Sequence, residues 1–175
     1  ASVDPDPAQE FTFDFNSSTR GEATLAFTQR HVNNQWVLSV NGNRIADLEK
    51  GDARKAVHYV IPSGVLRKGK NTLMVRAPSV GDDITVGPVT LWEAPFREVM
   101  RLGAMSVRVT DKDTGKGLPA RITVFAGEED APELPPIYFN QPATTTAARP
   151  GVVYTADGSA AFELPIGTYR VRATR

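Results

Sequence analysis

The sequence predicts an all-β fold built from two tandem β-sandwich domains, and three observations lead to this prediction. Short runs alternate between apolar and polar residues, as in residues 11–15, with the two-residue period of a half-buried strand. Turn-forming pairs such as Asn41-Gly42 and Asp157-Gly158 separate these runs at short intervals. No stretch of useful length repeats its apolar residues at the helical period. Many short strands at this spacing are typical of a sandwich or a jelly roll.

The first domain is predicted to span residues 9–95, after an extended tail at residues 1–8 where prolines disfavour a helix. Asn41-Gly42 should form a tight hairpin turn, because both residues tolerate positive φ. Gly87-Pro88 should interrupt the last strand with a bulge or an edge position. The predicted strands are residues 11–15, 23–28, 36–40, 44–48, 56–61, 72–77 and 84–92.

Residues 96–103 form the predicted connection, with at most one or two helical turns that lack a local cap. The second domain should cover residues 104–175. A long proline-rich insert at residues 126–150 interrupts it, and loops of this length are often functional or partly disordered. The predicted strands of this domain are residues 105–110, 120–125, 152–155, 160–164 and 168–173.

Composition restricts the classes of partner. The 20 basic and 20 acidic residues cancel, which argues against a nucleic-acid or membrane-surface partner, since such proteins usually carry a basic bias. The chain has no cysteine, so neither a disulfide nor a cysteine-based zinc site can form. Its two histidines, His31 and His58, are too few for a multi-histidine metal centre. A structural calcium ion is the one cofactor that its carboxylates leave open.

The second domain resembles the carboxypeptidase regulatory-like family, whose fold is a small prealbumin-like, Ig-like β-sandwich. The residues that carry this resemblance are Val107-Arg108-Val109-Thr110-Asp111, Thr114-Gly115-Lys116, Leu118-Pro119-Ala120, Asp157-Gly158 and Leu164-Pro165 with Gly167-Thr168-Tyr169. The resemblance covers roughly the last 70 residues of the chain, apart from the insert. The resemblance implies a spacer or packing role rather than a reaction.

The first domain resembles the galactose-binding-like jelly roll of carbohydrate-binding modules. The residues that carry this resemblance are the run Trp36-Val37-Leu38-Ser39-Val40-Asn41-Gly42, then Tyr59-Val60-Ile61-Pro62, Gly69-x-Asn71 and Ile84-Thr85-Val86-Gly87-Pro88. Such modules imply a carbohydrate ligand.

The order of the two domains is similar to the N-terminal accessory region of carbaryl-hydrolase-like PHP metallohydrolases. In those proteins a histidine-rich catalytic domain would follow, whereas no His-x-His motif occurs here. The first residue is Ala1 and the last strand-like run extends almost to Arg175. We therefore expect a piece of a longer, exported protein, extracellular or periplasmic, whose partners are a carbohydrate and a downstream catalytic domain of the same chain.

Five residues of the first domain are the candidate ligand-binding residues: Arg30, His31, Asn34, Trp36 and Trp92. Trp36 and Trp92 offer indole faces that can stack on a pyranose, although their strand positions also suit plain packing. The other three belong to a polar loop whose groups can hydrogen-bond sugar hydroxyls, although surface loops are polar in any case.

The sequence gives less support for a metal site or a catalytic site than for ligand binding. Asp82-Asp83 and the pair Asp111 and Asp113 could contribute to a calcium site, but each supplies few of the oxygens that calcium requires. His58 lies in a predicted strand, where a structural histidine is the ordinary interpretation. No Gly-x-Ser-x-Gly nucleophile motif is present. We therefore expect a non-catalytic accessory region. The alternatives are purely structural domains that shape or shield a neighbouring catalytic domain, or an unusual complete hydrolase.

Overall fold

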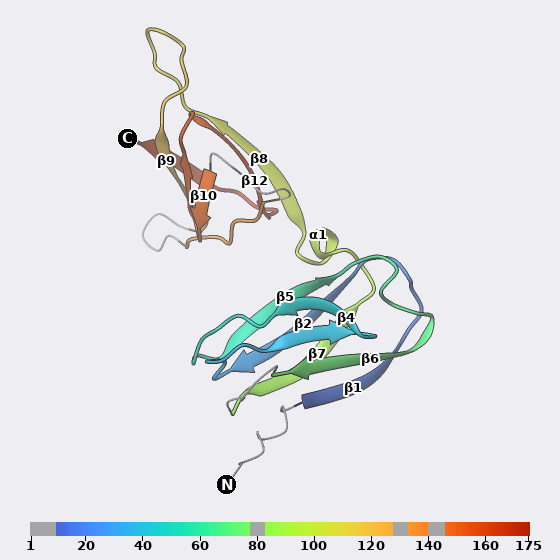
Figure 1. Cartoon of the computed structure of the whole chain (residues 1–175). Helices are drawn as coiled ribbons and strands as arrows, with labels where there is room; N and C mark the ends of the chain where they lie inside the picture. Colours follow the sequence, from blue (N-terminus) through green and yellow to red (C-terminus); the bar gives the residue numbers. More distant parts are fainter. Residues whose placement is uncertain (1–9, 78–82, 128–132, 140–145) are drawn as a thin grey trace. The chain divides into compact units, whose positions relative to one another are not determined.

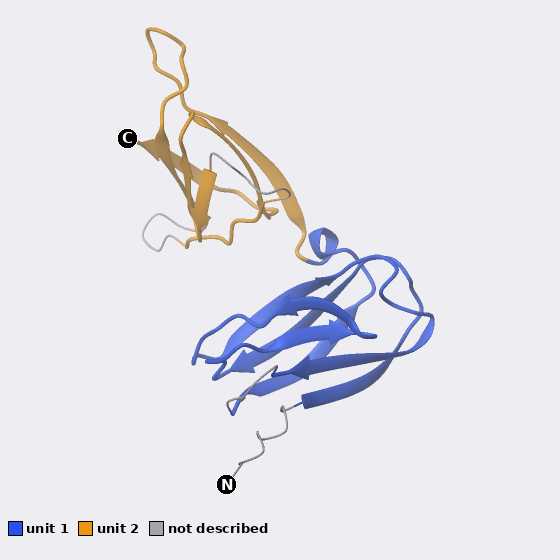
Figure 2. Ribbon diagram, in the orientation of Figure 1, with its two compact units in different colours: residues 1–99 blue, residues 100–175 orange. Residues whose placement is uncertain are grey.

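The computed structural model describes residues 10–77, 83–127, 133–139 and 146–175. The fold is all-β, and every strand pair in it is antiparallel. The chain divides into two compact units, Ala1–Val99 and Met100–Arg175 (Figure 2). The division falls inside the connection predicted at residues 96–103. No helix among the described residues has the length and apolar character needed to cross a bilayer.

Unit 1 consists of two antiparallel sheets (Figure 1). Apolar side chains from both sheets form one buried cluster. One sheet has the strand order β1-β6-β3-β4, and the other has the order β5-β2-β7. The strands are β1 (Glu10–Ser17), β2 (Ala23–Arg30), β3 (Val37–Val40), β4 (Asn43–Asp47), β5 (Lys55–Ile61), β6 (Gly69–Arg76) and β7 (Thr85–Trp92).

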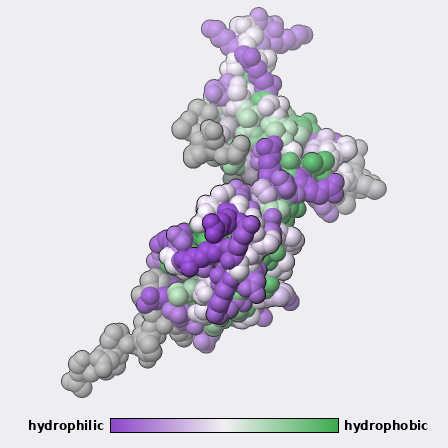
Figure 3. Space-filling view, turned by 90° about the vertical axis from the view of Figure 1, so that its right-hand side faces the viewer, coloured by the Kyte–Doolittle hydropathy of each residue, from purple (hydrophilic) through white to green (hydrophobic). Residues whose placement is uncertain are grey.

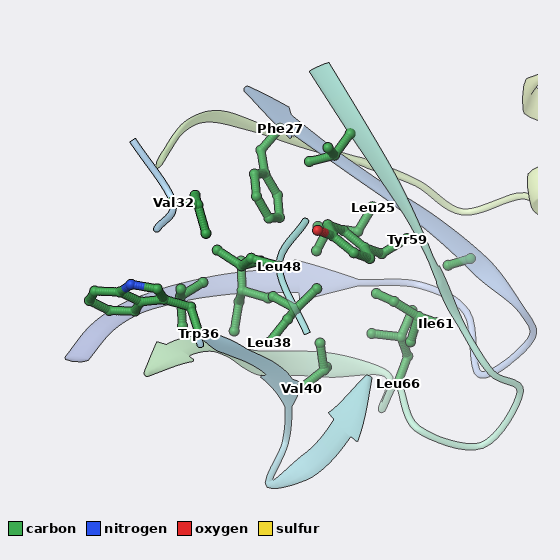
Figure 4. Close-up of a cluster of buried hydrophobic side chains, with 14 of the residues drawn as sticks. Leu25, Phe27, Val32, Trp36, Leu38, Val40, Leu48, Tyr59, Ile61 and Leu66 are labelled. Atoms are coloured by element: carbon green, nitrogen blue, oxygen red, sulfur yellow. The ribbon is translucent and has the colours of Figure 1, made fainter. Parts of the chain in front are cut away.

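The core of unit 1 follows from the alternation in its strands. On β2, Leu25 faces inward together with its register partners Tyr59 on β5 and Leu91 on β7. Figure 4 shows the resulting cluster, which extends from Trp36 at one end to Ile61 and Leu66 at the other. Each such side chain contributes about 1.5–3 kcal/mol when it is withdrawn from water, so this core is the main source of the unit's stability.

Two predicted local features of unit 1 are confirmed. Val40 pairs with Asn43 across a two-residue turn, and Asn41 and Gly42 have φ angles of 51° and 80°. Positive φ at both central residues is the requirement of the tight hairpin turn. The bulge also occurs, because the register between β2 and β7 shifts where Gly87-Pro88, a cis peptide, lies in β7.

The connection contains one short helix, α1 (Phe96–Val99). No residue just before it can cap it locally, and the cap comes from a distant side chain. The backbone N–H of Phe96 donates to Glu22 Oε1 at 3.2 Å. A carboxylate at this place satisfies an otherwise unpaired amide of the first turn. Through this contact and its packing against β2 and β5, α1 belongs to unit 1.

Unit 2 also pairs two sheets around an apolar cluster, which includes Ile122, Val124 and Phe162. Its larger sheet has the order β10-β11-β9-β13, and its smaller sheet pairs β12 with β8. The strands are β8 (Leu102–Arg108), β9 (Ala120–Phe125), β10 (Thr146–Arg149), β11 (Val152–Thr155), β12 (Ser159–Pro165) and β13 (Arg170–Thr174). β8 begins before the predicted domain start at 104, because Leu102 pairs with Pro165.

The prediction of an irregular insert over residues 126–150 is wrong in part. Its end forms β10, which pairs with β11, and Ala126 pairs with Glu133 in an isolated bridge. Tyr138 and Glu163 exchange two backbone hydrogen bonds of 2.9 and 2.8 Å, which adds Tyr138 to the edge of β12. These pairings involve strands later in the chain, so local composition could not reveal them. Residues 128–132 and 140–145 of the insert lie outside the described residues.

Candidate functional site

The polar loop after β2 brings three of the five candidate residues together. Arg30 ends β2, and His31 and Asn34 follow it, all three exposed. His31 has a φ of 58°, and the next residue, Val32, pairs with Gly51 through two backbone hydrogen bonds. The loop is therefore held against residues 51–52, and its polar side chains remain at the surface.

Trp36 does not belong to this exposed group. Its side chain is fully buried and packs in the core of unit 1 (Figure 4), and its ring centroid lies 5.7 Å from that of Phe11. A buried indole offers no free face on which a sugar can stack, so the packing role weighed from the sequence is the one that this structure supports for Trp36. We leave Trp36 out of the site that we propose.

Trp92 lies at the opposite end of β2 from the polar loop. It pairs with Thr24 near the start of β2, whereas Arg30 at the end of β2 pairs with Thr85. Six residues of strand separate Thr24 from Arg30, which corresponds to about 20 Å. The candidate residues therefore form no single site: three occupy the polar loop, Trp92 is distant from them, and Trp36 is buried.

Trp92 instead forms an aromatic cluster with two residues outside the candidate set. We call Trp92, His58 and Phe96 the Trp92 cluster. The rings of His58 and Trp92 lie 6.1 Å apart and only 24° from parallel, and the ring of Phe96 meets His58 edge-on at 6.3 Å. Trp92 remains 39% exposed, so part of its indole is open to solvent. Contacts of this geometry favour a fixed arrangement of the three rings.

The register of the β5-β2-β7 sheet explains this cluster. Val60, Thr24 and Trp92 form one cross-strand row on the outer face, and His58, Ala26 and Thr90 form the next. The central strand β2 contributes only Thr24 and Ala26 to these rows, and both are buried. Because they are small, the His58 and Trp92 rings can approach each other over β2 although their strands lie about 10 Å apart.

Sequence reasoning missed the partners of Trp92 for a specific reason. Alternation places His58 on the outer face of β5 and Trp92 on the outer face of β7. The position of β2 between those two strands is a long-range property that alternation does not contain. The short helix that carries Phe96 likewise depends on its distant cap, Glu22.

Asp111, one of the carboxylates considered for calcium, has an ordinary turn role. Asp111 Oδ1 accepts hydrogen bonds from the backbone N–H groups of Asp113 and Thr114 and from the Thr114 hydroxyl. The bonds from Thr114 hold the pKa of Asp111 below its usual value. This turn is the hydrophilic loop at the top of Figure 3. Asp82 lies outside the described residues, and among the described ones no three His, Asp or Glu side chains form a group that could hold a metal.

The outer face of the β5-β2-β7 sheet can bind by stacking and hydrogen bonding. Its two rows offer an open indole, an imidazole and the exposed Thr90 hydroxyl, and neither row contains a charged side chain. Such a surface suits an uncharged ligand that has both an apolar face and hydroxyl groups. Comparison of the chain with known protein families and with curated proteins gives no match in either case.

Proposed function

We propose that this chain is a non-catalytic accessory region in which unit 1 binds a neutral carbohydrate through the Trp92 cluster. The observation that carries the proposal is Trp92, a residue that is 39% exposed and whose ring stacks on His58, in two cross-strand rows of the sheet that contain no charged side chain. A pyranose presents an apolar CH face to an aromatic ring and hydroxyl groups around its rim.

Orientation of the ring favours binding. A flexible surface tryptophan loses rotamer freedom when a ligand immobilises it, and this loss weakens binding. The near-parallel His58 ring restricts the Trp92 side chain before a ligand arrives. His58 and Thr90 can then donate or accept hydrogen bonds at the edge of a stacked sugar.

The finer fold and the setting of the chain belong to the same proposal. We propose that unit 1 is a galactose-binding-like jelly roll and that unit 2 is a prealbumin-like sandwich acting as a spacer. The β-sandwich-like architecture of both units supports this proposal. From the sequence resemblance, we further propose that they precede a metal-dependent hydrolase domain of an exported protein, extracellular or periplasmic.

A second candidate function is purely structural, and one observation favours it. His58 contacts Trp92 on one side and Phe96 on the other, so the three rings also serve to attach α1 to the sheet. On this view the cluster is a packing surface that shapes or shields a neighbouring catalytic domain, and no glycan binds to it.

Affinity electrophoresis in gels that contain neutral polysaccharides, such as galactan, xylan and glucan, separates the two candidates. The carbohydrate proposal expects retention in at least one gel, and Trp92→Ala should abolish that retention while the fold is kept. Phe13→Ala is the matched control, since Phe13 is 36% exposed but lies on β1 in the other sheet. If no neutral gel retains the chain, or if both variants bind equally well, the structural role is correct instead.

A further inference from the structure

The outer face of the larger sheet of unit 2 carries an unusual set of side chains. Thr123 on β9 pairs with Val152 on β11 and with Arg172 on β13, and Val152 pairs in turn with Arg149 on β10. Directly paired residues project to the same side of a sheet, and so do residues two positions apart on a strand. Arg149 and Arg172 therefore share one face, and Arg121, Tyr154, Phe125 and Arg170 join them.

The opposite face of this sheet is the core side. Ile122, Val124 and Val153 alternate with the residues named above and are fully buried in the apolar cluster of unit 2. The four arginines and Tyr154 are exposed, whereas Thr123 and Val152 in the middle of the face are buried. The exposed arginines thus surround the buried residues Thr123 and Val152 on the solvent side of the sheet. We call this side of the sheet the arginine face.

Nothing in these four strands compensates the positive charge. The strands β9, β10, β11 and β13 read ARITVF, TAAR, VVYT and RVRAT, without one Asp or Glu. Among the described residues, no carboxylate forms an ion pair with Arg121, Arg149 or Arg172. In a chain of net charge zero, these four strands concentrate positive charge without a carboxylate of their own.

The arginine face also places a ring directly beside a guanidinium group. Tyr154 is the register partner of Arg121, so their Cβ atoms lie about 5 Å apart. Tyr154 is 42% exposed. The ring of Phe125 is less available, because the guanidinium of Arg172 lies over it at 6.0 Å from the centroid. Tyr154 and Arg121 together therefore present a stacking surface and a planar two-pronged donor side by side.

We propose that the arginine face binds the carboxylate groups of an acidic polysaccharide built from uronic acid residues. Arginine matches a carboxylate with two parallel hydrogen bonds, and a uronic acid carries that carboxylate on the same ring whose apolar face can stack on Tyr154. Arg121, Arg149 and Arg172 on three different strands can engage successive residues of a polymer that lies across the sheet. The proposal goes beyond neutral-sugar binding by unit 1 and does not depend on it.

Affinity electrophoresis of the full chain in a gel containing polygalacturonate tests this proposal. We expect retention there and none in fully methyl-esterified polygalacturonate, which has the same backbone without the charges. The double variant Arg121→Gln with Arg172→Gln should weaken retention at least tenfold. The matched control is Arg54→Gln with Arg67→Gln, which removes two exposed arginines from unit 1 and should change retention less than twofold. Trp92→Ala should leave this retention unchanged, so failure of the neutral-sugar proposal would be seen separately.

Two further variants distinguish a built site from diffuse charge. Arg121→Lys with Arg172→Lys keeps the charge but loses the planar fork, and it should still weaken retention several-fold. Tyr154→Ala should weaken binding to polygalacturonate but leave binding to polyglutamate, which has no sugar ring, unchanged. Three outcomes would each overturn the proposal. The lysine variant could keep full retention, or the control variant Arg54→Gln with Arg67→Gln could lose as much retention as Arg121→Gln with Arg172→Gln. The third outcome is that the chain binds single-stranded DNA more tightly than polygalacturonate at the same salt concentration. Thermal unfolding of every variant confirms that the fold is intact.

Discussion

The carboxylate of Glu93 accepts a hydrogen bond of 2.7 Å from the hydroxyl group of Ser17, across 76 positions of the chain. The backbone N–H and the hydroxyl of Ser18 donate to the same carboxylate. Ser17 ends β1, an edge strand of one sheet, and Glu93 follows β7, an edge strand of the other sheet. This contact therefore fastens the two sheets of unit 1 together at one end.

Glu93 should make unit 1 sensitive to acid. The hydrogen bonds from the Ser18 and Ser17 hydroxyls, with the Ser18 amide, lower the pKa of Glu93 from 4.5 to about 2. A depressed pKa in the folded state means that the stabilisation is present above the unfolded value and is lost as the pH falls through the folded value. We expect Glu93→Gln to have a lower free energy of unfolding than the wild type at neutral pH. This difference in free energy should shrink as the pH falls from about 4.5 to about 2, because the wild-type carboxylate becomes protonated.

Urea denaturation at a series of pH values measures that difference. Glu98→Gln removes another exposed carboxylate from the same region, on α1, and serves as the control. A stability difference for Glu93→Gln that stays constant across the acid range would show that the ionised carboxylate is not what fastens the sheets.

The two tryptophans should differ sharply in their contribution to stability. Trp36 is fully buried, so Trp36→Ala should lower the free energy of unfolding by about 3–5 kcal/mol, because it leaves a cavity in the core. Trp92 is 39% exposed, so Trp92→Ala should cost about 1–2 kcal/mol. Urea unfolding followed by circular dichroism compares the variants without relying on tryptophan fluorescence. If both variants lost the same free energy of unfolding, Trp36 would not be more deeply buried than Trp92, and the reason for leaving Trp36 out of the site would fail.

The polar loop provides an independent test of where a neutral sugar binds. It lies about 20 Å along β2 from Trp92, so one sugar ring cannot contact both. We expect Asn34→Ala and His31→Gly to leave retention in neutral polysaccharide gels within about twofold of the wild type. Glycine suits position 31 because the backbone there has a φ of 58°. A large loss of retention with an unchanged melting temperature would instead place the binding site in the loop.

Local pattern predicted much of this fold, because the properties that it encodes are local. Alternation in residues 23–28 marks β2 and its buried face, and Asn41-Gly42 marks a hairpin, since side-chain direction and φ preference belong to single residues. Strand order is different. The order β5-β2-β7 brings His58 to Trp92, and the pairing of β10 with β11 regularises the end of the insert. Neither follows from a window of neighbouring residues, so the exposed ring of Trp92 could be proposed from sequence but its partners could not.

Two glycines in unit 2 have similar backbone conformations but differ in the space around them. Gly115 and Gly158 both have positive φ, 69° and 83°, so alanine is conformationally unfavourable at either position by about 1–2 kcal/mol. A Cβ on Gly115 would meet nothing within 4 Å. A Cβ on Gly158 would overlap the carbonyl oxygen of Val109 and lie 2.5 Å from the amide nitrogen of Leu118.

Gly158→Ala should therefore be the more harmful variant. Val109 donates its N–H to Gly158 and accepts a hydrogen bond from Leu118, so these backbone groups cannot move apart without breaking the bonds between them. We expect Gly115→Ala to lower the free energy of unfolding by about 1–2 kcal/mol and Gly158→Ala by about 2–5 kcal/mol, because overlap adds to the strain. Hydrogen exchange should show the loss of protection on β8 and β12, beside the crowded glycine. Equal destabilisation by the two substitutions would mean that φ alone decides the cost and that the Asp157-Gly158 turn does not press against Val109.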